Sequence, residues 1–232
     1  MLELRDVHAY YGKSHILQGV SLEVRDGELV GVLGRNGVGK TTLLKSIMGL
    51  VPPRAGSVVF GGVELRHRSA HEIPRLGIGY VPQGRRIFPL LTVRENLRTG
   101  LAKASTSLDE DAAFAPVFVN FPLLRARLDQ RGGTLSGGEQ QMLAISRALL
   151  GGPRLIMLDE PLEGLMPAMV AMVRDTVRRV ADTGVSVVLV EQNVRMVLDA
   201  VDRVYIMQKG RVTFDGRPHA CTDEVLLQHL GV

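Results

Sequence analysis

A glycine-rich segment at residues 34–41, GRNGVGKT, has the residue types and spacing of a loop that binds phosphate. It follows the apolar run ELVGVLG and precedes leucine and isoleucine residues at helical spacing. Its glycines let backbone N–H groups turn towards phosphate oxygens, and the positive end of a helix adds to the attraction. Lys40 would bring a positive charge to the β- and γ-phosphates, and the Thr41 hydroxyl would ligate Mg²⁺. The predicted nucleotide-binding residues of this segment are Gly34, Arg35, Asn36, Gly37, Val38, Gly39, Lys40, Thr41 and Thr42.

Two neighbouring acids, Asp159 and Glu160, follow the apolar run LIML. Ligands of open α/β folds bind at the carboxyl ends of such strands, so both acids are expected at that edge. Asp159 would hold the magnesium ion, and Glu160 would orient and deprotonate an attacking water molecule. An Asp-Glu pair after a strand is otherwise an ordinary solvated turn. The phosphate loop earlier in the chain favours the catalytic interpretation.

A third motif, LSGGEQQ at residues 135–141, precedes a predicted helix. Ser136 is a good helix cap, and Gly137 and Gly138 allow another molecule to come close to the backbone. The hydroxyl, the free N–H groups and the helix dipole would all face an anion. Ser-Gly-Gly alone is compatible with an ordinary helix start, but the full string with Glu139 and Gln140 is more specific. Residues 136–139 are therefore expected to bind an anion.

The order of secondary structure along the chain predicts an α/β fold. Strand patterns in LELRDV, VSLEV and ELVGVLG fill the first part, and RSAHEIPRLG predicts a brief helix. Between residues 84 and 151 the pattern changes to helical segments interrupted by proline. After Pro153, apolar strands alternate with helices, and the chain ends in a predicted hairpin around Lys209-Gly210. Apolar strands that alternate with helices indicate a mostly parallel sheet covered on both faces.

The composition is that of an ordinary globular protein, with 232 residues, 45% hydrophobic and 22% charged. The 28 basic residues are scattered among 24 acidic ones, which argues against nucleic acid as a partner. Cys221 is the only cysteine, so no intramolecular disulfide can form. Glu3 and Asp6 stand where a secretory signal would be basic and then apolar. The apolar runs are far shorter than the ~20 residues of a membrane helix, so the chain is not expected to span a bilayer by itself.

Taken in this order, the phosphate loop, the LSGGEQQ signature and the acid pair resemble the nucleotide-binding subunits of ATP-binding cassette (ABC) transporters. The resemblance covers essentially the whole chain. It implies a P-loop NTPase fold in one domain, 1–232, with an N-terminal antiparallel β subdomain. The catalytic core would comprise residues 1–83 and 152–232, and an inserted helical signature subdomain residues 84–151. ATP and Mg²⁺ would be the cofactors, and two subunits would pack head to tail so that each phosphate loop faces the other subunit's signature.

The same resemblance gives roles to three further residues. Tyr11 stands where the family places an aromatic that stacks on adenine. Gln83 matches the glutamine that reaches the magnesium ion and the attacking water. Gln192 occupies the place of a common switch histidine; its amide can donate to the γ-phosphate but cannot shuttle a proton. In the PLEGLMP segment, Glu163 and Met166 replace a small polar residue and an aspartate, which weakens the usual contact across the dimer.

Longer stretches, among them PQGRRIFPLLTVRENL, PLEGLMP and LVEQN, resemble the second ATPase subunit of branched-chain amino-acid importers. Importers of urea or short amides carry similar subunits. The resemblance implies separate membrane permease subunits, docked in part by residues 85–88, and an indirect link to a solute-binding protein. It also implies a second cassette, either a related ATPase, which is favoured, or a second copy of this chain. The chain would lie peripherally on the cytoplasmic face of the membrane.

Other functions fit the residues less well. An exporter ATPase of the same family is the nearest alternative. A non-transport ABC ATPase that acts on DNA would need a long coiled coil where this chain has about fifty residues, and ribosome-acting types carry two cassettes. A GTPase would need Asn-Lys-x-Asp, and no asparagine here is followed by lysine. His67 and His71 lack a third metal ligand nearby, and the spacing of Met166, Met169 and Met172 suits helix packing.

Overall fold

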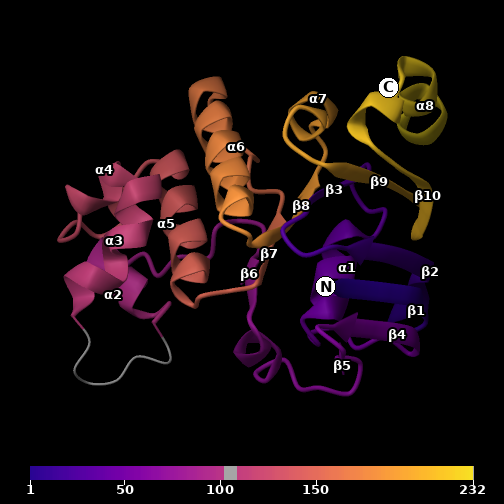
Figure 1. The fold of residues 1–232 in the computed structure, drawn as a ribbon, viewed down its shortest axis with the longest axis horizontal. Helices are drawn as coiled ribbons and strands as arrows, with labels where there is room; N and C mark the ends of the chain where they lie inside the picture. The colour runs from indigo at the N-terminus through magenta and orange to yellow at the C-terminus, as the bar shows by residue number, and fades with distance from the viewer. Residues whose placement is uncertain (102–108, 232) are drawn as a thin grey trace.

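The computed structural model describes residues 1–101 and 109–231, whose strands form two sheets (Figure 1). The smaller sheet has the strand order β2-β1-β4-β5 and is antiparallel throughout. Its strands are long where apolar residues alternate with polar ones. Their bounds are β1 (Leu2–Tyr11), β2 (Ser14–Val24), β4 (Ala55–Phe60) and β5 (Val63–Glu64).

The larger sheet has the order β10-β9-β3-β8-β7-β6 and is parallel except for the edge strand β10. Its inner strands are apolar because both faces are covered. The β9–β10 pair is the hairpin that the Lys209-Gly210 turn predicts. The bounds are β3 (Leu29–Leu33), β6 (Ile78–Val81), β7 (Leu155–Asp159), β8 (Ser186–Glu191), β9 (Arg203–Gln208) and β10 (Arg211–Gly216).

Alternate residues of the central strands build two separate cores. In β7, Leu155 and Met157 pack towards the antiparallel sheet, whereas Ile156 and Leu158 pack towards the helices of the opposite face. Helix α1 (Lys40–Ile47) belongs to the first core and lies between the two sheets (Figure 1). The six-stranded sheet is therefore buried on both faces, and its carboxyl edge is where polar residues can gather.

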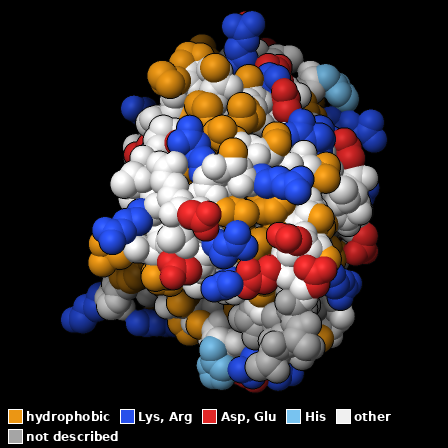
Figure 2. Space-filling view, turned by 90° about the vertical axis from the view of Figure 1, so that its left-hand side faces the viewer, with side chains coloured by type: hydrophobic (Ala, Val, Ile, Leu, Met, Phe, Trp, Pro, Cys, Tyr) orange, Lys and Arg blue, Asp and Glu red, His pale blue; other side chains and the backbone are white. Residues whose placement is uncertain are grey.

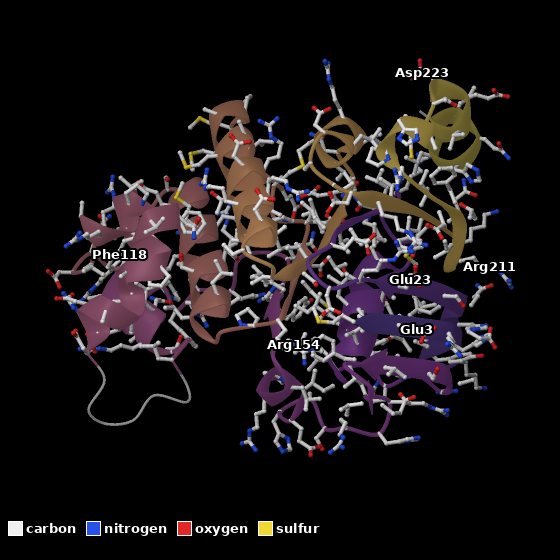
Figure 3. The ribbon with its side chains drawn as sticks, viewed as in Figure 1. Glu3, Glu23, Phe118, Arg154, Arg211 and Asp223 are labelled. Atoms are coloured by element: carbon white, nitrogen blue, oxygen red, sulfur yellow. The ribbon has the colours of Figure 1, made fainter. Side chains whose placement is uncertain are left out.

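Helices α2 to α5 collect at the end of the molecule opposite the antiparallel sheet (Figure 1). Figure 3 shows this separation, with Phe118 of α3 at one end, Glu3 and Glu23 at the other, and Arg154, before β7, between them. In Figure 2, which views the helical end, acidic and basic side chains lie intermixed. The remaining bounds are α2 (Val93–Arg98), α3 (Glu110–Asn120), α4 (Pro122–Arg125), α5 (Gly137–Leu150), α6 (Pro167–Asp182), α7 (Val194–Leu198) and α8 (Asp223–Leu230).

The α/β class and the two-sheet arrangement agree with the sequence prediction. The brief helix predicted in RSAHEIPRLG forms as a 3₁₀ helix of one turn, Ile73–Leu76. Pro74 removes an N–H donor, and Gly77, with φ +97°, ends the turn. The boundaries at 83/84 and 151/152 stay predictions, and residues 102–108 of the predicted helical subdomain lie outside the described residues. Within the described ranges, no helix is long and apolar enough to cross a membrane.

Candidate nucleotide site

The loop between β3 and α1 wraps around the ammonium group of Lys40, which is only 3% exposed. Its Nζ donates to the carbonyl oxygens of Gly34 at 2.8 Å and Arg35 at 3.1 Å. Gly34 cannot carry a side chain, because a Cβ there would lie 2.8 Å from the carbonyl oxygen of Met207. Gly39 caps α1 with φ +111°, a left-handed conformation that suits glycine. The glycines thus close the loop around one buried cation.

The β9–β10 hairpin supports this loop from the side. The N–H of Gly210 donates to the carbonyl oxygen of Val38 at 2.9 Å, and the carbonyl of Gly210 accepts from Gln18 of β2 at 2.8 Å. Gly210 has φ +77°, and a Cβ there would lie 2.0 Å from the carbonyl oxygen of Ile16. One glycine therefore joins the phosphate loop, the hairpin and the antiparallel sheet. At the tip of the loop Arg35 and Asn36 are exposed.

Asp159 ends β7 at the same edge of the sheet and is 1% exposed. Its carboxylate accepts hydrogen bonds from Thr41 Oγ1 at 3.0 Å and from the Tyr80 hydroxyl at 3.1 Å. Burial raises the pKa of Asp159, and these two hydrogen bonds oppose the rise. Burial also raises the pKa of Tyr80, which keeps its phenol protonated as a donor. A hydroxyl and a carboxylate oxygen this close together match the hard oxygen ligands that Mg²⁺ prefers.

Glu160 is the centre of a cluster drawn from three neighbouring strands. Its Oε1 lies 3.1 Å from Lys40 Nζ. Its Oε2 accepts from Gln192 Nε2 at 3.0 Å and from Gln83 Nε2 at 3.4 Å. The backbone takes φ +48° at Glu160, and its N–H donates to Val190 of β8 at 2.9 Å. The cluster exists because β6, β7 and β8 are parallel neighbours whose carboxyl ends meet.

A buried acid that the sequence motifs do not identify, Glu191, lies beside this cluster at the end of β8. It is 5% exposed, and its carboxylate accepts from the N–H groups of Leu162 at 2.9 Å and Gln192 at 3.1 Å. Burial raises the pKa of Glu191. This acid ties the loop after the acid pair to the loop that carries Gln192. Its position directly before Gln192 is the one signal that sequence reasoning could have used.

Two more residues of the cluster carry no predicted chemistry. Tyr80, in the run IGYVPQ, is the second donor to Asp159. Glu163, in the PLEGLMP segment, accepts from Gln83 Nε2 at 2.9 Å. Both hydrogen bonds depend on the order of the strands in the sheet, because Tyr80 and Asp159 are 79 residues apart in the sequence and Gln83 and Glu163 are 80 residues apart.

The signature residues start α5 with a complete capping box. Ser136 Oγ accepts from the Glu139 N–H at 3.4 Å, and the Glu139 carboxylate accepts from the Ser136 N–H at 2.7 Å. Glu139 also pairs with Arg127 at 3.0 Å, so its side chain serves the helix start. A Cβ at Gly138 would lie 2.2 Å from Met169 Cε, so α6 packs closely on this helix start.

Within the described residues, no hydrogen bond or ion pair joins residues 136–139 to the phosphate loop. Among the described residues, no hydrogen bond joins Tyr11 to the acid cluster either; this residue ends β1 and has 47% of its surface exposed. Its neighbour Tyr10 instead stacks on His15 with 4.2 Å between ring centroids. The fold thus brings together the phosphate loop, the acid pair, Gln83 and Gln192, and it leaves the signature and Tyr11 outside that cluster. The predicted roles of all these residues stay predictions.

Comparison with known proteins gives the same family for most of the chain. The family model described as ABC transporter matches residues 17–163. The branched-chain amino acid transport ATP-binding protein BraG of Pseudomonas aeruginosa is 43% identical over 91% of this chain and 91% of its own length. The probable branched-chain amino acid transport ATP-binding protein LivF of Archaeoglobus fulgidus is 38% identical over 99% of this chain and 95% of its own length. The lipopolysaccharide export system ATP-binding protein LptB of Escherichia coli is 37% identical over 90% of this chain and 87% of its own length.

Solved structures agree with this assignment. A nucleotide-free ATP-binding cassette from an ABC transporter superposes with a TM-score of 0.85 at 25% identity, over 100% of this chain and 95% of that one. A dimeric ATP-binding cassette in a post-hydrolysis state, bound to ADP and Pi, superposes with a TM-score of 0.84 at 25% identity, over 94% and 99%.

Proposed function

The chain belongs to the ABC transporter ATP-binding family, and from that premise we propose that it drives the import of branched-chain amino acids or closely related small solutes. ATP hydrolysis is the activity of the family, and the chain works with separate membrane subunits. The observation that carries the site assignment is the convergence of Lys40, Asp159 and Glu160 at one sheet edge. The solute is inferred from the BraG and LivF relatives, because a nucleotide-binding subunit does not itself touch the solute.

The nucleotide phosphates would bind in the loop around Lys40. This residue already has its ammonium group enclosed by backbone carbonyls, so a phosphate would approach a fixed charge. Loop N–H groups and the start of α1 would add further donors. Tyr11, exposed at the end of β1, would stack on adenine. Loss of Lys40 would therefore remove phosphate binding and leave Glu160 without its cation.

Three residues would hold Mg²⁺: Thr41, Asp159 and Gln83. Thr41 and Asp159 already lie 3.0 Å apart and supply the oxygen ligands that the ion needs. The bound ion would neutralise charge on the phosphate oxygens. Burial raises the pKa of Asp159, and a bound cation would favour its ionised form.

Glu160 would orient the attacking water and accept its proton. Its carboxylate lies 3.1 Å from Lys40 Nζ and accepts hydrogen bonds from Gln192 and Gln83. Gln192 would hold the carboxylate in place and donate to the γ-phosphate. Because an amide cannot exchange a proton as an imidazole does, Gln192 would act by hydrogen bonding alone.

A second cassette would complete the site. The signature residues of this chain lie away from its own phosphate loop, so they are available to the nucleotide of a partner. We propose a head-to-tail pair with a related ATPase subunit, or with a second copy of this chain. Dimeric cassettes among the similar structures support such a pairing.

The membrane subunits would dock in a groove of about 910 Å³ between the core and the helical end. Arg85 and Arg86, which follow Gln83, line one wall of this groove, and Phe88 shortly after them is 46% exposed. Arg147 of α5 covers the Phe88 ring and is half-buried, and burial lowers its pKa. The basic and polar lining residues include Arg75, Tyr80, Arg85, Arg86, Thr99 and Arg147. Docking there would place the chain on the cytoplasmic face of a membrane.

Purification of the tagged chain from detergent-solubilised native membranes tests this function. We expect a polytopic membrane protein and a second ATPase to copurify. We also expect ATPase turnover to rise with the solute-binding protein and leucine-type amino acids, with an Arg86→Glu/Arg147→Glu variant failing to recover the membrane protein. Stimulation by urea or amides would change the assigned solute from branched-chain amino acids to urea or amides. Copurification with a lipid exporter or with ribosomes would overturn the importer assignment.

A further inference from the structure

We propose that Glu163 is a positioning residue that orients the amide of Gln83 for the metal of the nucleotide site. The inference rests on the proposed function, because it concerns the same Mg²⁺-ATP site. Glu163 stands outside the phosphate loop, the acid pair and the signature. It is the residue three positions after Glu160, in a loop that otherwise contributes no side chain to the cluster.

The hydrogen bonds of Gln83 specify which way its amide faces. Nε2 donates to Glu163 Oε2 at 2.9 Å and to Glu160 Oε2 at 3.4 Å. An ionised carboxylate only accepts, so two carboxylates on one side require the NH₂ group there. The amide oxygen, the only atom of this group able to bind a cation, then faces away from Glu163 and Glu160. Without Glu163, the amide would be held only by the longer bond to Glu160 and could turn over.

Glu163 is itself held by the loop that carries it. Its N–H donates to the carbonyl oxygen of Glu160 at 3.3 Å. The preceding residue, Leu162, is 6% exposed and donates its N–H to the buried Glu191 carboxylate at 2.9 Å. The next residue, Gly164, turns the chain away with φ +67°. The backbone therefore fixes where the Glu163 side chain starts, and the carboxylate reaches Gln83 from a rigid turn.

Glu160 cannot replace this function in the loaded site. One of its oxygens pairs with Lys40, and the other already accepts from Gln192. As the proposed general base, Glu160 would also have to bind the attacking water. Glu163 has no ion pair among the described residues and accepts from Gln83 alone. Because the Glu163 side chain is exposed, the gain from this single hydrogen bond is modest, and a several-fold effect is expected.

The test measures metal dependence without turnover. A fluorescent, non-hydrolysable ATP analogue, mant-AMPPNP, is titrated with Mg²⁺ in the presence of the full chain, and its affinity is also measured in EDTA. We expect Glu163→Ala to raise the Mg²⁺ concentration for half-maximal binding by about 3- to 10-fold, with affinity in EDTA unchanged. Glu163→Gln should stay within about twofold of wild type, because its amide oxygen can still accept from Gln83. Glu224→Ala, an exposed acid on α8, is the matched control.

A double-mutant comparison separates this role from a general effect of charge. If Glu163 acts through Gln83, Glu163→Ala will cause no further change in a Gln83→Ala chain. An unchanged Mg²⁺ requirement in Glu163→Ala, or an equal effect in the Gln83→Ala background, would overturn the inference. Failure of the wild-type chain to bind mant-AMPPNP at all would instead overturn the proposed nucleotide site, and the inference with it.

Discussion

At the scale of single residues, the Lys40–Glu160 ion pair determines the state of the site before nucleotide binds. Both side chains are almost fully buried and lie 3.1 Å apart. Neither charge would be stable there alone, because an unpaired buried charge is costly. A nucleotide phosphate would offer Lys40 a second anion and free one oxygen of Glu160 for water. In the proposed mechanism, the same pair would keep the Glu160 carboxylate occupied until the nucleotide binds.

The buried Glu191 predicts a pH-dependent contribution to stability. Because its pKa is raised on folding, the folded protein binds this proton more tightly than the unfolded chain. The contribution of Glu191 to the free energy of unfolding therefore falls as pH rises from about 4.3, the ordinary glutamate value, through the raised pKa. Glu191→Gln removes this dependence, so the free energy of unfolding of wild type minus that of the variant should decrease with pH.

Urea unfolding at several pH values between about 4 and about 7 checks this sign. Glu224→Gln, at an exposed position on α8, provides the comparison for the removal of one surface acid. A wild-type minus Glu191→Gln difference that stays constant, or grows with pH, would contradict the assignment of Glu191 as a buried carboxylate with a raised pKa.

At the scale of elements, Gly210 links three of them, and its replacement tests the support of the phosphate loop. Gly210→Ala would press a Cβ against the Ile16 carbonyl oxygen in a left-handed conformation. We expect a loss of about 2 kcal/mol or more in the free energy of unfolding. Nucleotide affinity should also fall, because the bond from Gly210 to Val38 would shift.

Gly152→Ala is the matched control for this change. Gly152 also has positive φ, +62°, but a Cβ there meets nothing within 4 Å. The control should lose about 1 kcal/mol, the cost of the left-handed backbone alone, and keep its nucleotide affinity. Equal losses for the two variants in urea unfolding would show that the close contact with Ile16 carries no energy.

The elements also show what local sequence can predict. Alternating strands and the glycine loop before α1 follow from patterns within about ten residues, and they form as expected. The brief helix predicted in RSAHEIPRLG forms as a single 3₁₀ turn, because Pro74 and Gly77 limit its length. The contacts of Tyr80 and Glu163 could not be predicted, because they depend on the β8-β7-β6 order, which joins residues about 80 positions apart.

At the scale of the whole molecule, the family assignment made from the three motifs is confirmed by the comparisons. The motifs identified the family because several short strings occur in one order. The solute could not be identified in this way, because a nucleotide-binding subunit does not bind it. The separation between the signature and the phosphate loop is also a property of the whole fold. It supports the proposal that one chain holds two half-sites and that hydrolysis needs a second cassette.

The most direct measurement of the central claim follows radiolabelled ATP on the purified Glu160→Gln chain, alone and with its partner cassette. Glutamine keeps the size of the side chain but cannot accept the proton from water. We expect ATP to be retained through gel filtration in a closed dimer, with hydrolysis reduced by about 10²- to 10³-fold relative to wild type. Hydrolysis by the pure variant at the wild-type rate would contradict the role of Glu160 and the site built around it.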